Sequence, residues 1–271
     1  MTNLMNADWY KVRHGAALRN TFLSFLAVVV IFAAFTAFSS SDESAGFLTV
    51  TTDPPIQSDV IEQGENDVSG ASFSNEMQQS FFIPFFFLPI VLAVFCADFN
   101  AGTHRNILSY ESKRGRVYLS KLLLSVVLCV GMMAASQAFS ILLGGVLFGF
   151  TGFSAAFFTR TLLVLALQIP ICIGFISVCH FLVAITKKSS ATIAAFIVGY
   201  IAVVVLLQSV SSYVPSLSWI MMMEPQTGGQ IMAMYEAATP CEIITILLYH
   251  AAISGIAIVA GLLHYRKVDM P

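Results

Sequence analysis

Residues 162–207 read LLVLALQIPICIGFISVCHFLVAITKKSSATIAAFIVGYIAVVVLL, two apolar stretches free of Lys, Arg, Asp and Glu that are separated by a pair of lysines. The stretches Leu162–Ile185 and Ala191–Leu207 each fall in the range of about 17–25 residues that an α-helix needs to cross a bilayer. Lys187 and Lys188 stand in the short turn between them. Because short loops rich in Lys and Arg stay on the cytosolic side of a membrane, we expect two membrane helices joined by a cytosolic turn.

Apolar stretches of this kind recur along the whole chain. The 271 residues are 57% hydrophobic and 10% charged, against about 25% charged in a typical soluble domain. Four more apolar stretches occur at about 20–38, 80–97, 121–143 and 242–263. The sequence therefore predicts an all-α polytopic membrane protein, a single transmembrane domain over residues 1–271 with six transmembrane helices.

The basic residues indicate how these helices are oriented. Of the 13 Lys and Arg residues, all but Arg160 lie near the N-terminus, between residues 105 and 121, at the 187–188 turn or near the C-terminus. Two long stretches, Ser39–Gln78 and Gln208–Cys241, contain no Lys or Arg. By the positive-inside rule, we expect both termini in the cytosol and these two stretches outside.

Three segments are expected to lie at the membrane surfaces. The N-terminal residues combine aromatic and cationic side chains, which predicts an interfacial helix; the residues concerned are Trp9, Tyr10, Lys11 and Arg13. The apolar, methionine-rich stretch 208–241 predicts short re-entrant helices on the outer side before the last span. The acidic stretch 39–78 is expected to be mostly irregular, and an acidic outer segment does not suit nucleic acid.

Several kinds of chemistry are disfavoured. No predicted span has an acidic or basic residue in its middle, whereas proton- and sodium-coupled carriers need such groups. His180 and His250 each lack a carboxylate at helical spacing, which favours packing over a proton relay. The five cysteines show no zinc-binding spacing and no catalytic motif is present, so we expect neither a metal site nor an enzyme. A nucleotide-binding P-loop needs a Gly-Lys pair, and this dipeptide does not occur.

The third apolar stretch carries small or soft residues at helical spacing, namely Ser125, Cys129, Met133, Ser136, Ser140 and Gly144. Small residues allow membrane helices to approach closely. The stripe is therefore interpreted as a seam between helices of one subunit. The alternative is a substrate path, in which Gln137, Ser140 and Gln168 would supply polar groups.

The segment 98–121 reads DFNAGTHRNILSYESKRGRVYLSK, in which an acid follows a span, Gly-Thr turns the chain, and a basic cluster leads into the next span. This order resembles the signature segment of type-2 ABC transporter permeases, six-span subunits that pair with separate ATPases. The matching positions are Asp98, Gly102, Thr103, Arg105, Leu108, Ser109, Arg114 or Arg116, and Lys121. The N-terminal ADWYKVR, residues 7–13, is similar to the opening segment of the same family.

The resemblance implies a function as well as a fold. It implies a permease of a bacterial ATP-driven exporter in the cytoplasmic membrane, assembled from two permeases, identical or paralogous, and two ATPase subunits. The 98–121 loop and the interfacial helix would contact the ATPase, which would bind ATP and Mg²⁺, while this chain would bind no cofactor itself. The expected substrate is amphipathic, such as an antimicrobial peptide, a drug or a lipid-like molecule, and membrane lipid is an expected partner. The alternative is a non-transporting scaffold or sensor whose acidic outer stretch binds a partner.

Overall fold

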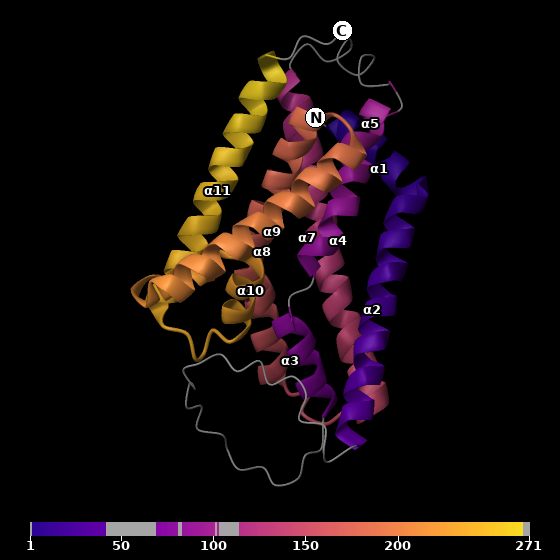
Figure 1. Ribbon diagram of the computed structural model, residues 1–271. Helices are drawn as coiled ribbons and strands as arrows, with labels where there is room; N and C mark the ends of the chain where they lie inside the picture. The colour runs from indigo at the N-terminus through magenta and orange to yellow at the C-terminus, as the bar shows by residue number, and fades with distance from the viewer. Residues whose placement is uncertain (1, 42–68, 81–82, 101, 103–113, 268–271) are drawn as a thin grey trace.

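The computed structural model describes residues 2–41, 69–80, 83–100, 102 and 114–267, and within these ranges it is helical with no strand, which confirms the all-α class. The helices are arranged as a bundle (Figure 1). In chain order they are α1 (Thr2–His14), α2 (Ala16–Ser41), α3 (Gly70–Ser80), α4 (Ile83–Val91), the π-helix η1 (Leu92–Cys96), α5 (Ala97–Asn100), α7 (Arg114–Phe148), α8 (Ala155–Thr186), α9 (Ser189–Tyr213), the 3-10 helix η2 (Pro215–Met223), α10 (Pro225–Ala233) and α11 (Pro240–Lys267).

Four helices in the described ranges, α7, α8, α9 and α11, are long and apolar enough to cross a membrane. A fifth crossing results if α1 and α2, which meet at a bend of 57°, are taken together as one span. The segment Phe86–Phe99 is apolar but shorter. The apolar helices agree with a membrane-embedded protein, and four of the six predicted spans correspond to these long helices.

The hairpin of α8 and α9 has the tight turn that the lysine pair predicted. Lys187 adopts a left-handed backbone conformation with φ of 54° and donates its amide hydrogen to the carbonyl oxygen of Val183, which ends α8. The hydroxyl groups of Thr186 and Thr192 are 2.6 Å apart across the turn. Local hydrogen bonds therefore close the turn where the apolar stretches stop.

The 39–78 stretch, expected to be mostly irregular, begins with the last residues of α2 and ends in helix α3, which spans residues 70–80; residues 42–68 lie outside the described ranges, so the expectation is not tested there. The side chains and amides of Ser69 and Ser72 bond reciprocally at 2.9 and 3.1 Å and so cap the start of α3. The helix then packs closely on α7, since a Cβ atom at Gly144 would lie only 2.7 Å from the carbonyl oxygen of Gly70. Two glycines thus hold a largely polar helix against the bundle.

The predicted second span, 80–97, corresponds to α4, η1 and α5, with α3 preceding it. Pro84 lies in the first turn of α4, where a missing amide hydrogen costs no helical bond. Further along, the helix widens to the π-turn η1, in which the amide of Ala97 bonds the carbonyl of Leu92. The π-turn buries Phe95 and Cys96, and such turns are frequent at functional sites.

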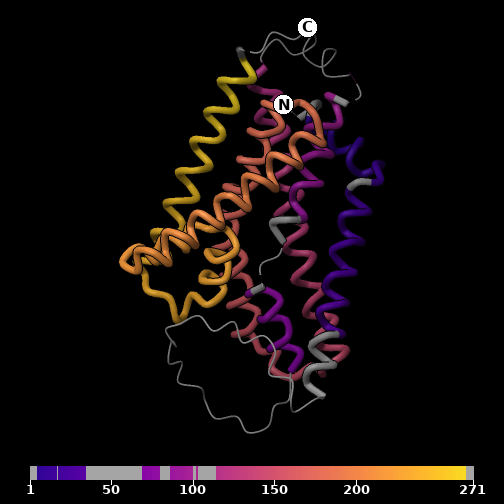
Figure 2. The backbone as a smooth tube through the Cα atoms, in the orientation of Figure 1, coloured from indigo at the N-terminus to yellow at the C-terminus, as the bar shows by residue number. Residues whose placement is uncertain are grey.

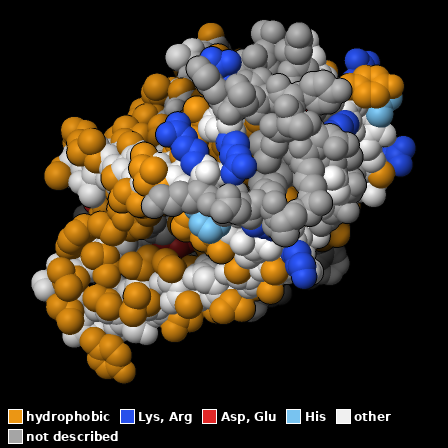
Figure 3. Space-filling view, turned by 90° about the horizontal axis from the view of Figure 1, so that it is seen from above, with side chains coloured by type: hydrophobic (Ala, Val, Ile, Leu, Met, Phe, Trp, Pro, Cys, Tyr) orange, Lys and Arg blue, Asp and Glu red, His pale blue; other side chains and the backbone are white. Residues whose placement is uncertain are grey.

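The stretch between the last two spans forms two short helices, as expected, although the 3-10 helix η2 precedes the α-helix α10. Helix α10 contacts α8 and α3 at the end of the bundle opposite the α8–α9 turn (Figures 1 and 2). The face at the other end carries Lys and Arg side chains on its described part (Figure 3). Arg13, Arg116 and Lys188 are exposed residues of the segments that reach this end.

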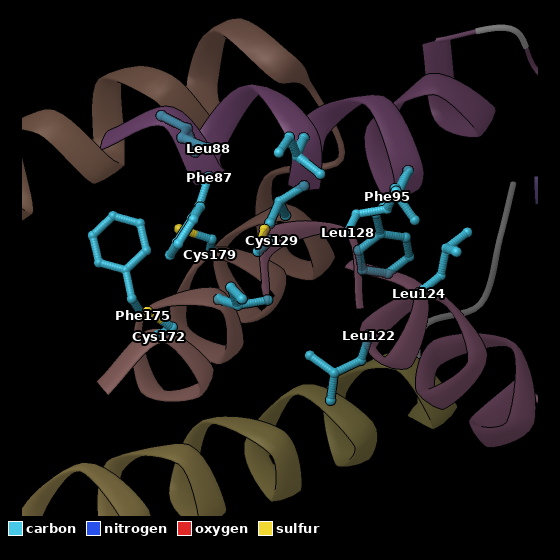
Figure 4. Close-up of a cluster of buried hydrophobic side chains, with 14 of the residues drawn as sticks. Phe87, Leu88, Phe95, Leu122, Leu124, Leu128, Cys129, Cys172, Phe175 and Cys179 are labelled. Carbon is cyan, nitrogen blue, oxygen red and sulfur yellow. The ribbon is translucent and has the colours of Figure 1, made fainter. Parts of the chain in front are cut away.

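The core lies where α4 and η1 meet α7 and α8. Its buried side chains are apolar or sulfur-containing (Figure 4) and include Phe87, Leu88, Phe95, Leu122, Leu124, Leu128, Cys129, Cys172, Phe175 and Cys179. The small-residue stripe of α7 faces this interior, since Ser125, Cys129, Met133, Ser136, Ser140 and Gly144 are all buried. The core adjoins a cluster of charged side chains, since the core residue Val94 accepts a hydrogen bond from Lys121.

Candidate functional site

A buried lysine lies at the centre of the site. Lys121 belongs to α7, which begins seven residues before it, and its side chain is fully buried. The ammonium nitrogen Nζ lies 2.5 Å from Oδ2 of Asp98 and 3.1 Å from each carboxylate oxygen of Asp8. It also donates to the carbonyl oxygen of Val94 in the π-turn at 3.1 Å. A buried cation is tolerated only when it is paired and hydrogen-bonded in this way.

A second lysine completes the cluster. Lys11 Nζ donates to Oδ1 of Asp98 at 2.8 Å, and its side chain is 50% exposed. The cluster of Asp8, Lys11, Asp98 and Lys121 therefore balances two acidic with two basic groups. It joins α1, α5 and α7, which are separated along the chain, at the basic end of the bundle.

The two carboxyl groups are not equivalent. Burial opposes ionisation of Asp98, but the ammonium of Lys121 and the hydrogen bond from Lys11 hold its pKa below the ordinary value of 3.8. Burial raises the pKa of Asp8, and the attraction of Lys121, which Asp8 shares with Asp98, does not offset that effect. Asp98 is accordingly the better compensated carboxylate of the pair.

The structure brings together only the two ends of the 98–121 segment that the sequence singled out, Asp98 and Lys121. Gly102 is exposed and has a positive φ of 66°, a conformation that glycine adopts without strain. Arg114 and Arg116 lie in the first turn of α7. The remaining predicted positions, Thr103, Arg105, Leu108 and Ser109, lie outside the described residues.

Helix α1 has one face in the cluster and one on the surface. Asp8 and Val12, four residues apart, are buried, whereas Trp9 is 43% and Tyr10 64% exposed. Lys11 and Arg13 are also exposed. Aromatic and basic side chains on the outer face suit a membrane interface. Sequence reasoning missed Asp8 as a site residue, although its spacing from Val12 places both on one helical face.

The polar residues named for a substrate path are buried and lie toward the end of the bundle opposite the α8–α9 turn. Gln137 Nε2 donates to the hydroxyl oxygen of Ser74 on α3 at 2.8 Å. Gln168 Nε2 donates to carbonyl oxygens of Gly229 on α10 at 3.1 Å and of Gln78 on α3 at 3.4 Å. Ser140 bonds only the carbonyl of Ser136, within its own helix, among the contacts of the described residues.

Arg160, which the sequence predicts to lie outside, connects three helices at the same end of the bundle. Its guanidinium donates to Oδ1 of Asn75 at 2.8 Å and to the carbonyl oxygen of Ala233 at 2.9 Å. It therefore ties α8 to α3 and α10. With Gln137 and Gln168, it makes α3 and α10 integral parts of the bundle.

Neither histidine forms a hydrogen bond or ion pair with a carboxylate in the described part of the chain, although the carboxyl of Glu224 lies near His250. His180 Nε2 lies 2.9 Å from the hydroxyl of Ser125, and its ring stacks on Phe95 with centroids 5.0 Å apart. The described residues contain no group of three His, Cys, Asp or Glu side chains that could hold a metal ion. In the described part of the chain, the site consists of the paired charges of Asp8, Lys11, Asp98 and Lys121.

Comparisons of the chain with profiles of known protein families, with characterised proteins and with solved structures find no match.

Proposed function

We propose that this chain is the membrane-spanning subunit of an ATP-driven exporter of the type-2 permease class, with ATP and Mg²⁺ bound by a separate ATPase subunit. One observation carries the proposal. Asp98 and Lys121, the two ends of the segment that resembles the family's signature, are joined by a buried ion pair of 2.5 Å. Asp8, from the N-terminal segment that also resembles the family, bonds the same ammonium group.

This junction suits a subunit that is moved by a partner from the cytosolic side. A force on the 98–121 segment would reach α5 and α7 together, and a force on α1 would reach both through Asp8 and Lys11. Such contacts shift a conformational equilibrium only if the ATPase binds one state more tightly than the other. Nucleotide-dependent docking of the ATPase would provide this difference in affinity.

Six spans complete the proposed topology. The four long helices would be joined by α2 as the first span and by α4 and η1 as the second, with α1 in the cytosolic interface and Asp98 in the segment that follows the second span. The outer helices η2 and α10 would re-enter the membrane, which the packing of α10 against α8 and α3 supports. Both termini would then lie in the cytosol of a bacterial cell, and a second permease copy would complete the pathway for an amphipathic substrate.

The cationic side chains at the basic end of the bundle could attract either an acidic surface of a protein partner or anionic lipid head groups. Lys187 and Lys188 lie in the α8–α9 turn, and Arg114 and Arg116 begin α7. Anionic lipid head groups attract such residues with about 1 kcal/mol each near the surface. Salt sensitivity of partner binding would therefore not distinguish the ATPase from lipid, and the decisive test must recover the partner itself.

The test is co-purification of the tagged chain from native membranes in mild detergent. We expect a Walker-motif ATPase subunit to be recovered and the complex to hydrolyse ATP, whereas the chain alone binds no nucleotide. Recovery of the functional chain without an ATPase would contradict the proposal.

A pair of glycine variants tests coupling within that complex. A Cβ atom at Gly102 or at Gly131 meets nothing within 4 Å, so neither Gly102→Val nor Gly131→Val produces a clash. Gly102 has a positive φ and Gly131 lies within α7, so only Gly102→Val strains the backbone of the proposed coupling segment. We expect Gly102→Val to keep ATP hydrolysis but lose export, and Gly131→Val to keep both. Equal export by the two variants would place coupling elsewhere.

A further inference from the structure

A cavity of about 310 Å³ lies between α8, α9 and α11, beside the start of α10. This volume is at the lower end of the range for small-ligand pockets, about 300–1,000 Å³. Phe and Tyr side chains from all three helices line it, namely Phe175 of α8, Phe196 and Tyr200 of α9, and Tyr249 of α11. The rings of Phe175 and Phe196 meet edge to face with centroids 4.9 Å apart, and those of Phe196 and Tyr200 are nearly parallel with centroids 6.1 Å apart. A cluster of aromatic rings therefore borders the cavity.

The cavity belongs to the side of the bundle that faces lipid. Its helices α9 and α11 are the least buried of the four long helices, with 11% and 22% of their apolar windows buried, against 39% for α7 and 50% for α8. The lining also includes the apolar side chains of Leu182, Val203 and Ile253, and Gly199 of α9, which is itself exposed. Helices α9 and α11 diverge toward the basic end (Figure 1). A hydrocarbon chain can therefore enter between these two helices from the membrane.

A buried carboxyl group lies beside the cavity. Glu224 is only 5% exposed, and the residues before and after it in the sequence both line the cavity. Its carboxyl accepts hydrogen bonds from the Tyr200 hydroxyl, from the Gln226 amide, and from both the amide and the hydroxyl of Thr227. A carboxylate offers about four acceptor sites when it is ionised. The four donors therefore match an ionised Glu224.

This negative charge has no counter-charge in the described structure. The described ion pairs involve other residues, and neither Lys nor Arg occurs among the described residues that line the cavity. A buried charge without a counter-charge is unfavourable. Tyr200 lines the cavity and bonds the Glu224 carboxylate through its hydroxyl. A cation that lies against the Tyr200 ring is therefore separated from the carboxylate by that one side chain.

The hydrogen bonds of Glu224 restrict the kind of cation. A primary ammonium or a guanidinium group has N–H donors that need acceptors, but the four donors already occupy the acceptor sites of the carboxylate. A quaternary ammonium group carries its charge without N–H donors, and aromatic rings attract such a group by cation–π interactions. An anionic or zwitterionic head group would bring a negative charge close to Glu224. The described surroundings therefore favour a quaternary ammonium group.

We propose that this cavity binds a single-chain amphiphile with a quaternary ammonium head group, drawn from the membrane. The aromatic rings of the lining contact the head group, and Glu224 supplies the counter-charge without contacting it. The inference is independent of the proposed export function, because binding requires only this chain. Its failure would leave the ATPase test above unaffected, and the converse also holds.

The test uses the purified chain in lipid nanodiscs and three photoactivatable probes that share one diazirine-bearing dodecyl chain. Their head groups are trimethylammonium, the uncharged tert-butyl group of the same shape, and a primary ammonium. Labelled peptides are mapped by mass spectrometry, and labelling is normalised to the exposed face of α7 to correct for partition into the membrane. We expect the trimethylammonium probe to label the cavity-lining parts of α8, α9 and α11 about fivefold more than either other probe.

Substitutions of single residues separate charge from shape. Glu224→Gln should reduce labelling by the trimethylammonium probe to near that of the tert-butyl probe and leave the latter unchanged. Glu242→Gln is the matched control, because Glu242 likewise accepts bonds from the amide and hydroxyl of a threonine, Thr239, but does not line or flank the cavity. It should label like the wild type. Phe196→Leu removes an aromatic ring but stays apolar, so it should lower labelling by the trimethylammonium probe about threefold and affect the tert-butyl probe less.

Larger side chains in the lining provide the control for site occupancy. A Cβ atom at Gly199 meets nothing within 4 Å, so Gly199→Leu should fold and reduce labelling by the trimethylammonium probe. Gly255→Leu, on α11 and also free of contacts at Cβ, lies outside the cavity lining and should label like the wild type. Val203→Trp enlarges the lining at a second position and serves if Gly199→Leu does not fold.

Three results would overturn the assignment. The first is equal normalised labelling of the wild type by the trimethylammonium and tert-butyl probes, which would show that charge is not recognised. The second is a primary ammonium probe that labels the cavity as strongly as the quaternary one. The third is undiminished labelling in both Gly199→Leu and Val203→Trp, which would place the ligand elsewhere.

Discussion

The ammonium of Lys121 lies 2.5 Å from Oδ2 of Asp98, although the two residues stand at opposite ends of a 24-residue segment. Both side chains are almost fully buried. The ion pair therefore joins the two ends of the 98–121 segment and holds the start of α7 beside α5. Because Asp8 bonds the same ammonium, the N-terminal helix is held at the same point.

Replacing Lys121 with Met should destabilise the protein strongly. The change leaves the buried Asp8 carboxyl without its cation and Asp98 with Lys11 alone, and breaking a buried pair costs about 3–5 kcal/mol. Lys11→Met is the matched control, because Lys11 is half exposed and a surface pair contributes about 1 kcal/mol or less. Thermal unfolding in detergent measures both. Similar losses of Tm in the two variants would contradict the central role of Lys121.

A variant of the cluster without buried charges distinguishes the cost of an unpaired charge from the cost of altered side-chain packing. Replacing Lys121 with Met together with Asp8→Asn and Asp98→Asn leaves no buried charge uncompensated. Buried ion pairs can be replaced by neutral groups at little cost. The triple variant should therefore recover much of the Tm that Lys121→Met loses.

Stability should depend on pH through Asp98 in one direction and through Asp8 in the other. The pKa of Asp98 is lowered in the fold, so its contribution is present above the ordinary value of 3.8 and is lost as the pH falls through the folded pKa. The pKa of Asp8 is raised by burial, so its contribution at low pH is lost as the pH rises from 3.8 through its folded pKa.

Thermal unfolding as a function of pH, compared with Asp98→Asn and Asp8→Asn, measures the two effects. The Tm advantage of the wild type over Asp98→Asn should shrink as the pH falls below 3.8, and its Tm relative to Asp8→Asn should decline as the pH rises above 3.8. Differences that stay constant with pH in both variants would disprove the assigned shifts.

Thiol labelling in intact cells tests the orientation. Cys241 is exposed and must first be replaced, whereas the four other cysteines are buried. In that background, cysteines at Ala237, between α10 and α11, and at Asp59 should react with a membrane-impermeant reagent. A cysteine at Ser190, beside the α8–α9 turn, should react only after the membrane is permeabilised. Labelling of Ser190 but not Ala237 in intact cells would invert the topology.

Much of the helical framework could be predicted because its signal is local. An uncharged apolar run needs a helix to satisfy its backbone in a membrane, so the stretches 162–185 and 191–207 correspond closely to α8 and α9. Helix α3 was not predicted, since its composition is polar and its place depends on the contact of Gly70 with Gly144 on α7. The sequence feature that could have indicated this helix is the pair Ser69 and Ser72, three residues apart, whose side chains and amides bond reciprocally at its start.

The candidate site could be predicted only in part, for a similar reason. Asp98 and Lys121 were singled out by a motif, but the motif does not say that they touch. Asp8 lies 113 positions from Lys121, and its role depends on how α1 docks against α7. Pairings of this kind arise from tertiary structure, which the periodicity of a single segment does not contain.

The last prediction separates the two interpretations of the buried glutamine residues. If Gln168 belongs to a seam, Gln168→Leu should lower the Tm, because the carbonyl groups of Gln78 and Gly229 lose their donor. Hydrogen bonds between membrane helices contribute about 0.6 kcal/mol on average and up to about 1.7 kcal/mol. The loss should therefore be clearly smaller than that of Lys121→Met.

Ser140→Ala is the control for this experiment. Ser140 is as buried as Gln168, but its described hydrogen bond is to a carbonyl of its own helix. Removing that hydroxyl breaks no contact between helices, so the Tm should stay near that of the wild type. Gln137→Leu, which loses the bond to Ser74 on α3, should behave like Gln168→Leu. If both glutamine variants instead kept the Tm of the wild type while export in the assembled complex fell, these residues would line the substrate path rather than join α3 and α10 to the bundle.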